Sequence, residues 1–342
     1  MDDFFALLKS YKGMVDEHIF NHLPQKHDIP EINNLFEMIN DYPQRGGKGL
    51  RPSILLIFCR AFGGDIKSAI NTAAALEIFQ NWIVIHDDIE DGSELRRGLP
   101  ALHVKHGVPL ALNAGDALAG KMWEILHDNR RILGDRMALD VIDQFLQMYS
   151  MTTAGQHIEL SWVYNKRWDL TSDDYFNMCQ RKTSWYTCST PAWTGAMIAG
   201  AVEQYRDIIF QFGSDLGVAF QIQDDVLNLV GNEKVYGKEI CGDLWEAKRT
   251  LITIDLMAKA TAGQKEFLKH AFDLPREQKN ADDVNTIFEL IKQYGCIDSA
   301  ITVSRELAAK AKSSFARLDG SINSEQREII LQLIDFMIDR KF

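Results

Sequence analysis

Residues 69–91 read AINTAAALEIFQNWIVIHDDIED, and this stretch decides the fold. Its side chains fall into stripes at spacings of three and four residues, the period of one face of an α-helix. One stripe contains Ala69, Ala73, Leu76, Gln80, Ile83 and Asp87, and a second contains Ile78, Trp82, Ile85 and Ile89. Because a helix that is apolar on more than one side is a buried helix, the stretch predicts a central helix with an acidic end.

The predicted helix ends in the acidic cluster 87–91 (DDIED), and a second cluster, 224–228 (DDVLN), lies in another apolar segment. Asp87 and Asp91 share a helix face, as do Asp224 and Asn228, because residues four apart lie one above the other. Carboxylates held together in apolar surroundings repel one another unless a cation lies between them. Hard oxygen ligands with room for water and phosphate suit Mg²⁺. The two clusters therefore predict a cavity in which magnesium ions bind a phosphorylated ligand.

The composition is that of a globular protein of 342 residues, 46% hydrophobic and 25% charged, with a formal net charge of -11. This charge argues against general nucleic-acid binding. The five cysteines form no CxxC pair, which favours a reduced, cytoplasmic compartment. The N-terminus lacks the features of a signal peptide, and no apolar stretch approaches the ~20 residues that span a bilayer. Strand patterns are scarce, so we expect a single all-α domain over residues 1–342.

Two short basic segments are candidates for binding the phosphate. Residues 46–52 (GGKGLRP) form a glycine loop before a helix, where backbone N–H groups approach an anion and Lys48 and Arg51 add charge. The loop lacks the Walker spacing, and a solvated connection is the alternative interpretation. Arg96 and Arg97 are adjacent and cannot share a helix face, so they could bind two different anions, or they could be ordinary surface charges.

Gly46 to Pro52 is followed, in order, by HDDIED (86–91), RRGLPALH (96–103), QIQDDVLNL (221–229), YGKE (236–239) and GDLWEAKRT (242–250). In these motifs the chain resembles the trans-polyprenyl diphosphate synthases, the farnesyl and geranylgeranyl diphosphate synthase family, from about residue 45 to 255. The resemblance implies the isoprenoid synthase fold, a single large helical bundle around a central cavity, and a homodimer. It also implies a magnesium-dependent prenyltransferase that condenses isopentenyl diphosphate with an allylic diphosphate.

The resemblance assigns expected roles to individual residues. The metal ligands, for three Mg²⁺ ions, would be Asp87, Asp91 and Asp224. The isopentenyl diphosphate site would contain Lys48, Arg51, Gln80 and Arg97. The allylic diphosphate site would contain Arg96, Lys182, Thr183, Gln221, Lys238 and Lys248. Lys182 and Thr183 would also lie beside the allylic cation, which makes them catalytic residues together with Asp87 and Asp224. Taken singly, these lysines and glutamines are equally compatible with solvated surface positions.

Two positions depart from the family pattern. The second acidic motif ends in Asn228 instead of Asp, and an amide oxygen can still face the metal shell through water. Glu159 stands where Asp is common, so a longer side chain must fit there. We interpret the last three residues, 340–342, as a frayed end, and closure over the site is the alternative.

Product length depends on the wall of an apolar tunnel beside the central helix. In the family a bulky residue five positions before the acidic motif closes this tunnel, and Trp82 stands there, although helix geometry alone does not place it in the tunnel. Ile83 is smaller than a second aromatic, which favours the twenty-carbon geranylgeranyl product over the fifteen-carbon farnesyl product. A terpene cyclase on the same scaffold and a non-catalytic partner subunit of a synthase are the alternative functions.

Overall fold

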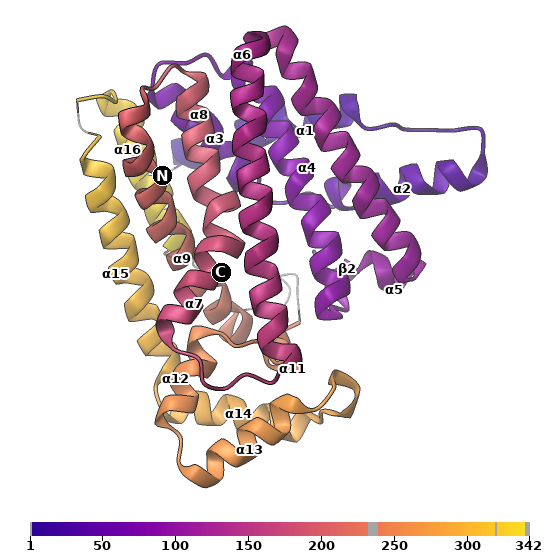
Figure 1. Ribbon diagram of the computed structural model, residues 1–342, viewed down its shortest axis with the longest axis vertical. Coiled ribbons are helices and arrows are strands. Elements are labelled where there is room, and N and C mark those ends of the chain that lie inside the picture. The colour runs from indigo at the N-terminus through magenta and orange to yellow at the C-terminus, as the bar shows by residue number, and fades with distance from the viewer. Residues whose placement is uncertain (1, 232–238, 319, 339–342) are drawn as a thin grey trace.

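The computed structural model describes residues 2–231, 239–318 and 320–338 (Figure 1). Within these ranges the regular structure is helical except for one hairpin, β1 (Leu95–Arg96) and β2 (Leu99–Pro100). The predicted all-α fold is therefore confirmed. No helix in the described ranges is long and apolar enough to cross a membrane.

The helices of the first half run from the N-terminus to the long α6. They are α1 (Asp2–His22), α2 (Pro30–Gln44), α3 (Leu50–Ala61), α4 (Ile66–Asp91), α5 (Leu102–His106) and α6 (Val108–Tyr164). Gly134, with φ 77° and ψ 163°, interrupts α6, and this backbone conformation is accessible mainly to glycine. Figure 1 shows the two arms of α6, 108–133 and 135–164, joined at the top of the molecule.

The second half begins with a continuous helical rod that changes its winding in the middle. It consists of α7 (Ser172–Cys179), the π-helix η1 (Gln180–Ser189) and α8 (Thr190–Ile198). A capping box at Thr171 and Asp174 starts the rod. The remaining elements are η2 (Glu203–Tyr205), α9 (Arg206–Val230), α11 (Gly242–Trp245), α12 (Leu251–Lys259), α13 (Ala262–Asp273), η3 (Arg276–Gln278), α14 (Ala281–Gln293), α15 (Cys296–Ala316) and α16 (Ser324–Ile338). π-Helical segments occur frequently at functional sites.

Helix α4 is the central helix that residues 69–91 predict. Asp65 caps its start by accepting the Lys67 N–H at 3.0 Å, and Gly92 ends it with φ 65°. Most of its length is buried, and it packs against α1, α3 and α6. The apolar stripes therefore hold α4 in the core and bring its acidic end to the edge of that core.

The buried apolar residues form two clusters. The larger one is built around α1, α3, α4, α6, α8 and α16, and the smaller one around α12, α13 and α14. Helices α9 and α15 contribute to both, since Phe212 and Phe315 belong to the larger cluster while Ile222 and Ala300 belong to the smaller. The single domain over residues 1–342 stays a prediction.

Candidate active site

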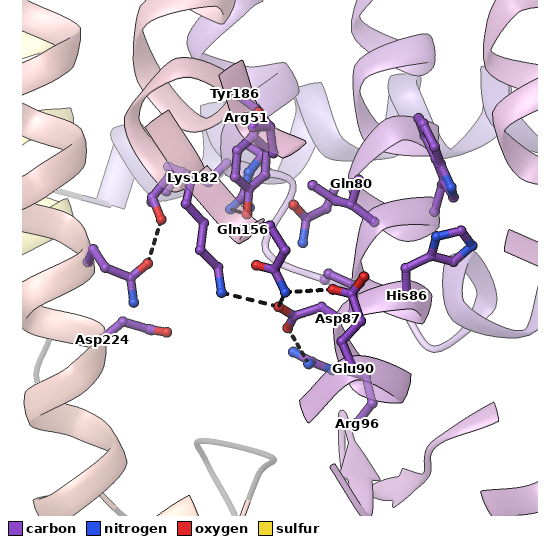
Figure 2. A pocket seen from close by; sticks show the side chains of 18 of the residues that line it. Arg51, Gln80, His86, Asp87, Glu90, Arg96, Gln156, Lys182, Tyr186 and Asp224 are labelled. Atoms are coloured by element: carbon purple, nitrogen blue, oxygen red, sulfur yellow. Dashed lines mark hydrogen bonds and ion pairs between the residues drawn. The ribbon is translucent and has the colours of Figure 1, made fainter. Parts of the chain in front are cut away.

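A cavity of about 830 Å³ lies between α4, α6, η1 and α9 (Figure 2). Its lining includes thirteen of the residues to which the resemblance gives a role. They are Lys48, Arg51, Gln80, Trp82, Ile83, Asp87, Arg96, Arg97, Lys182, Thr183, Gln221, Asp224 and Lys248. Residues from six separate stretches of the chain thus meet around one space.

The acidic end of α4 forms one wall of the cavity through Asp87. Its Oδ1 lies 3.3 Å from the Lys182 ammonium and 3.2 Å from the Gln156 amide nitrogen. Lys182 also pairs with Glu159, so the longer side chain at that position reaches the same ammonium. Although burial lowers the pKa of Lys182, the two carboxylates Glu159 and Asp87 outweigh it and raise the pKa above its ordinary value. Lys182 therefore stays charged beside the acidic wall.

The second acid of the first cluster, Asp88, points away from the cavity. It is fully buried and receives hydrogen bonds from Arg96 Nε at 2.9 Å and from the Tyr42 hydroxyl at 2.6 Å. Burial and the neighbouring carboxylate raise the pKa of Tyr42. Arg96 also reaches Asp87 Oδ2 at 3.4 Å. Asp88 thus anchors Arg96 at the cavity edge.

The opposite wall repeats this arrangement on α9. Asp224 lines the cavity, and Figure 2 shows it on a different helix from Asp87, with Lys182 and Gln156 between them. Unlike Asp88, Asp225 also borders the cavity, but it is largely buried and accepts hydrogen bonds from the Tyr175 hydroxyl at 2.6 Å and from the Gln221 amide at 2.8 Å. Burial raises the pKa of Asp225 to about 7. In each cluster the first acid faces the cavity and the second is held by a buried tyrosine.

Asp91 binds a lysine from the segment after α9. Its carboxylate lies 2.7 Å from Lys248 Nζ, and Glu246 lies 3.0 Å from the same nitrogen. Burial raises the pKa of Asp91 to about 7, and the Lys248 charge opposes that shift. Asp91 is not part of the cavity lining, and its side chain is 6% exposed. Asp91 and Lys248 thus connect α4 to the segment that carries α11.

The glycine loop forms the basic part of the cavity. Gly49, with φ 58°, starts α3, and Arg51 donates to the Tyr186 hydroxyl at 2.9 Å while its guanidinium lies 4.4 Å from the Tyr186 ring centre. A Cβ on Gly47 would come within 3.1 Å of Arg97 Nη2, so the loop packs tightly on this guanidinium. Glu77 is buried nearby, and burial raises its pKa although Arg51 and Arg97 oppose this.

The adjacent arginines point in different directions because they occupy a hairpin. Arg96 lies in β1, whereas Arg97 and Gly98 form the two-residue turn, with φ 54° and 75°. Such turns require positive φ at both positions. Arg97 donates to the Tyr42 carbonyl and to Asn81 Oδ1 at 3.3 Å. The expectation that the two arginines serve different anions is compatible with this geometry.

Trp82 lines the cavity together with Ile83, although helix geometry alone left its place open. The indole stacks on Tyr149 of α6, with ring centres 5.2 Å apart and planes tilted by 32°. It also meets Phe79 edge-on at 5.4 Å. This apolar part of the cavity is therefore bounded by aromatic side chains from two helices.

Asn228 makes a contact within the protein, and several functional residues were missed. The Asn228 amide oxygen accepts the Asp243 N–H at 3.1 Å, and the side chain lies outside the cavity lining. Its buried position at the end of α9 suits a structural amide. Tyr42, Tyr175 and Tyr149 carry no motif signal, because single tyrosines are common core residues.

Two predicted elements lie outside the described residues, namely Lys238 and the C-terminal residues 340–342. In the described ranges no three His, Cys, Asp or Glu side chains converge closely enough to hold a metal ion by themselves. Asp87, Asp91 and Asp224 therefore form no closed ligand set.

A family model described as polyprenyl synthetase matches residues 32–291. The chain belongs to the polyprenyl synthetase family. It is 32% identical over 314 residues to a geranylgeranyl diphosphate synthase of Sulfolobus acidocaldarius, covering 92% of each chain. It is also 32% identical over 298 residues to a geranylfarnesyl diphosphate synthase of Aeropyrum pernix, covering 86% of this chain and 91% of the relative.

Solved structures of polyprenyl synthetases share the fold. Geranylgeranyl pyrophosphate synthetase from Pyrococcus horikoshii superimposes with a TM-score of 0.86 at 31% identity, over 99% of both chains. A polyprenyl synthase from Caulobacter crescentus, complexed with calcium and isoprenyl diphosphate, gives 0.86 at 26% identity, over 100% of this chain and 98% of that one. The predicted family and fold are confirmed. The protein is a short-chain trans-prenyl diphosphate synthase, a prenyltransferase of isoprenoid biosynthesis.

Proposed function

We propose that this synthase condenses isopentenyl diphosphate with an allylic diphosphate, using Mg²⁺, and releases geranylgeranyl diphosphate as its main product. The observation that carries the proposal is the pairing of two acidic walls with a separate basic loop in one cavity. A cavity with two anion sites suits two diphosphate substrates. A terpene cyclase needs only one, so the basic loop favours condensation.

The carboxylates suit magnesium that is shared with a substrate. Mg²⁺ is usually held by one or two carboxylates together with substrate phosphates and waters. Asp87 and Asp91 on α4 and Asp224 on α9 would hold three ions between the walls, and the absence of a closed ligand set among the described residues agrees with shared coordination. When bound, the ions supply charge neutralisation for the departing diphosphate. The relative from Caulobacter crescentus holds calcium and isoprenyl diphosphate, which supports a divalent-cation site.

The basic residues divide into two groups around the cavity. Lys48, Arg51, Gln80 and Arg97 would hold isopentenyl diphosphate. Arg96, Lys182, Thr183, Gln221, Lys238 and Lys248 would hold the allylic diphosphate. Lys182 would act beside the reacting carbon, because its ammonium lies between the acidic wall and η1. Thr183 donates to Gln221 Oε1 at 2.7 Å, which orients both side chains at the same wall.

The chemistry then follows from charge placement. The allylic C–O bond breaks, and its electron pair leaves with the diphosphate. The isopentenyl double bond forms the new carbon–carbon bond, and the proton lost from the adjacent carbon passes to the released diphosphate. Preorganised cations stabilise the departing charge, and the apolar wall near Trp82 and Tyr149 keeps water away from the cation.

A short product follows from the aromatic pair Trp82 and Tyr149, which narrows the apolar part of the cavity. The relatives named for the twenty-carbon geranylgeranyl and the twenty-five-carbon geranylfarnesyl products are equally similar, so the aromatic wall, not the identity, supports the shorter of these two. The small side chain of Ile83 supports the twenty-carbon product over the fifteen-carbon one.

We also propose a homodimer. Exposed leucines lie along both arms of α6, with Leu110 51%, Leu139 59% and Leu146 48% exposed. A second copy of the chain could remove these apolar side chains from water.

The test is incubation of the purified protein with Mg²⁺, isopentenyl diphosphate and primers of five, ten and fifteen carbons, followed by chromatography of the products. We expect lengthened prenyl diphosphates that require both substrates. A cyclic hydrocarbon formed from the allylic diphosphate alone would indicate a cyclase, and no product with any primer would indicate a non-catalytic subunit.

A further inference from the structure

The connection between α13 and α14 contacts the segment that places Lys248 in the cavity. This segment, residues 239–249, contains α11 and lies beside α13 and α14 at the lower end of the molecule in Figure 1. Lys279 Nζ donates to the Trp245 carbonyl oxygen at 2.6 Å. Arg276 pairs with the Glu239 carboxylate, and its guanidinium lies 5.7 Å from the Trp245 ring centre. Two bases of one connection thus hold both ends of α11.

The backbone of segment 239–249 needs such restraint. Cys241 and Ala247 have φ of 60° and 58°, a region that residues with a Cβ adopt only when their surroundings enforce it. On the inner side, the Asn228 carbonyl accepts the Cys241 N–H at 2.8 Å. Arg249, which is 2% exposed, donates to the Ala247 carbonyl. The outer side is restrained by the α13–α14 connection.

The position of this segment determines where the Lys248 charge lies. Lys248 follows the Ala247 kink directly, and its ammonium lies 2.7 Å from Asp91 at the end of α4. A shift of α11 would move this ammonium relative to both acidic walls. The α13–α14 connection is therefore mechanically linked to the cavity although it lies outside it.

We propose that Lys279, assisted by Arg276, is a positioning residue that holds segment 239–249 so that Lys248 faces the allylic diphosphate. This inference rests on the proposed function of Lys248. It gives the region after residue 260, where the motif resemblance ends, a part in the reaction. Lys279 touches neither substrate site and acts through the Trp245 carbonyl.

The charged groups around Lys279 are Arg249 before α12, Arg276 in η3, Glu246 after α11, and Asp273 at the end of α13. Burial, followed by the two arginines, lowers the pKa of Lys279 to about 8. A charged donor makes a stronger hydrogen bond than a neutral one. The link from Lys279 to Trp245 is therefore strongest below pH 8 and weakens as the pH rises through that value.

The experiment compares Lys279→Met with the conservative Lys279→Arg, and with Lys292→Met as a matched control on α14. Lys292 is a surface residue that pairs with Glu289. We expect Lys279→Met to raise KM for the allylic diphosphate about tenfold, the effect of losing one charge-assisted hydrogen bond, and to leave KM for isopentenyl diphosphate within about twofold. Lys279→Arg and Lys292→Met should stay near the parent values.

Hydrogen exchange provides a readout that needs no turnover. Amides of residues 239–249 should exchange faster in Lys279→Met, while those of α4 and α9 keep their protection. Between about pH 7.5 and 9, KM for the allylic diphosphate should rise more in the parent protein than in Lys279→Arg. The reason is that Lys279 loses its proton over this range whereas arginine keeps its charge. Unchanged exchange in segment 239–249, or an equal rise in both KM values, would overturn the proposal. Because exchange is measured on the protein alone, this result is separable from a failure of the proposed condensation.

Discussion

Trp82→Ala should lengthen the product, and the structure indicates by how much. The indole is 7% exposed, lines the cavity, and is packed between Tyr149 and Phe79, with ring-centre distances of 5.2 and 5.4 Å. Removing it deletes the aromatic wall from α4 and leaves Tyr149 without its partner. The freed space adjoins the existing cavity and is therefore open to the growing chain.

The expected change in product ratio follows from the free energy that a closed hydrophobic pocket requires to accept a longer chain. One extra methylene in a closed pocket costs about 1–3 kcal/mol, which corresponds to about 10–200-fold. One further condensation adds five carbons, so the intact wall disfavours it by at least this amount. We expect Trp82→Ala to raise the ratio of the next longer product to the parent product by at least about tenfold. The loss of core packing costs up to ~3–5 kcal/mol, so thermal unfolding should be recorded alongside.

The assay is chromatography of the dephosphorylated products made from isopentenyl diphosphate and a fifteen-carbon primer. Tyr149→Ala should act in the same direction, because Tyr149 forms the other half of the wall. Tyr164→Ala is the matched control, since Tyr164 lies on the same helix but is 88% exposed and outside the cavity lining. If a folded Trp82→Ala makes the parent product distribution, the aromatic pair does not limit chain length and the reasoning is refuted.

Three further predictions concern the metal walls, the buried acids and the dimer. Asp87→Asn and Asp224→Asn should each lower kcat at least about 100-fold with unchanged circular dichroism, and near-normal turnover would contradict the metal assignment. Tyr42→Phe should lower the free energy of unfolding by about 2 kcal/mol in urea titrations, because Asp88 loses a buried hydrogen-bond donor. A change smaller than the experimental error would show that the hydrogen bonds from Arg96 are enough to stabilise the buried Asp88 carboxylate. Leu139→Glu should shift sedimentation from dimer to monomer, whereas a monomeric parent would refute the interface.

The fold was predictable because its signal is local and repeated. The stripes of residues 69–91 require a helix with several apolar faces, and α4 has that environment. The contact between Lys248 and Asp91, in contrast, could not be predicted from a local sequence pattern. It joins residues far apart in sequence and depends on left-handed backbone at Cys241 and Ala247, where no glycine marks the turn. Sequence patterns report such positions only when glycine or asparagine occupies them.

The two acidic pairs show which features of the site helix geometry alone could predict. Consecutive residues on a helix project about 100° apart, so the two acids of a pair point in different directions. The second acid of each pair is buried, and a buried carboxylate needs donors. Asp88 obtains an arginine and a tyrosine, whereas Asp225 obtains a tyrosine and an amide without a cation. The need for partners was predictable, but their identity was not, because the two tyrosines come from α2 and α7, and helix packing alone brings them there.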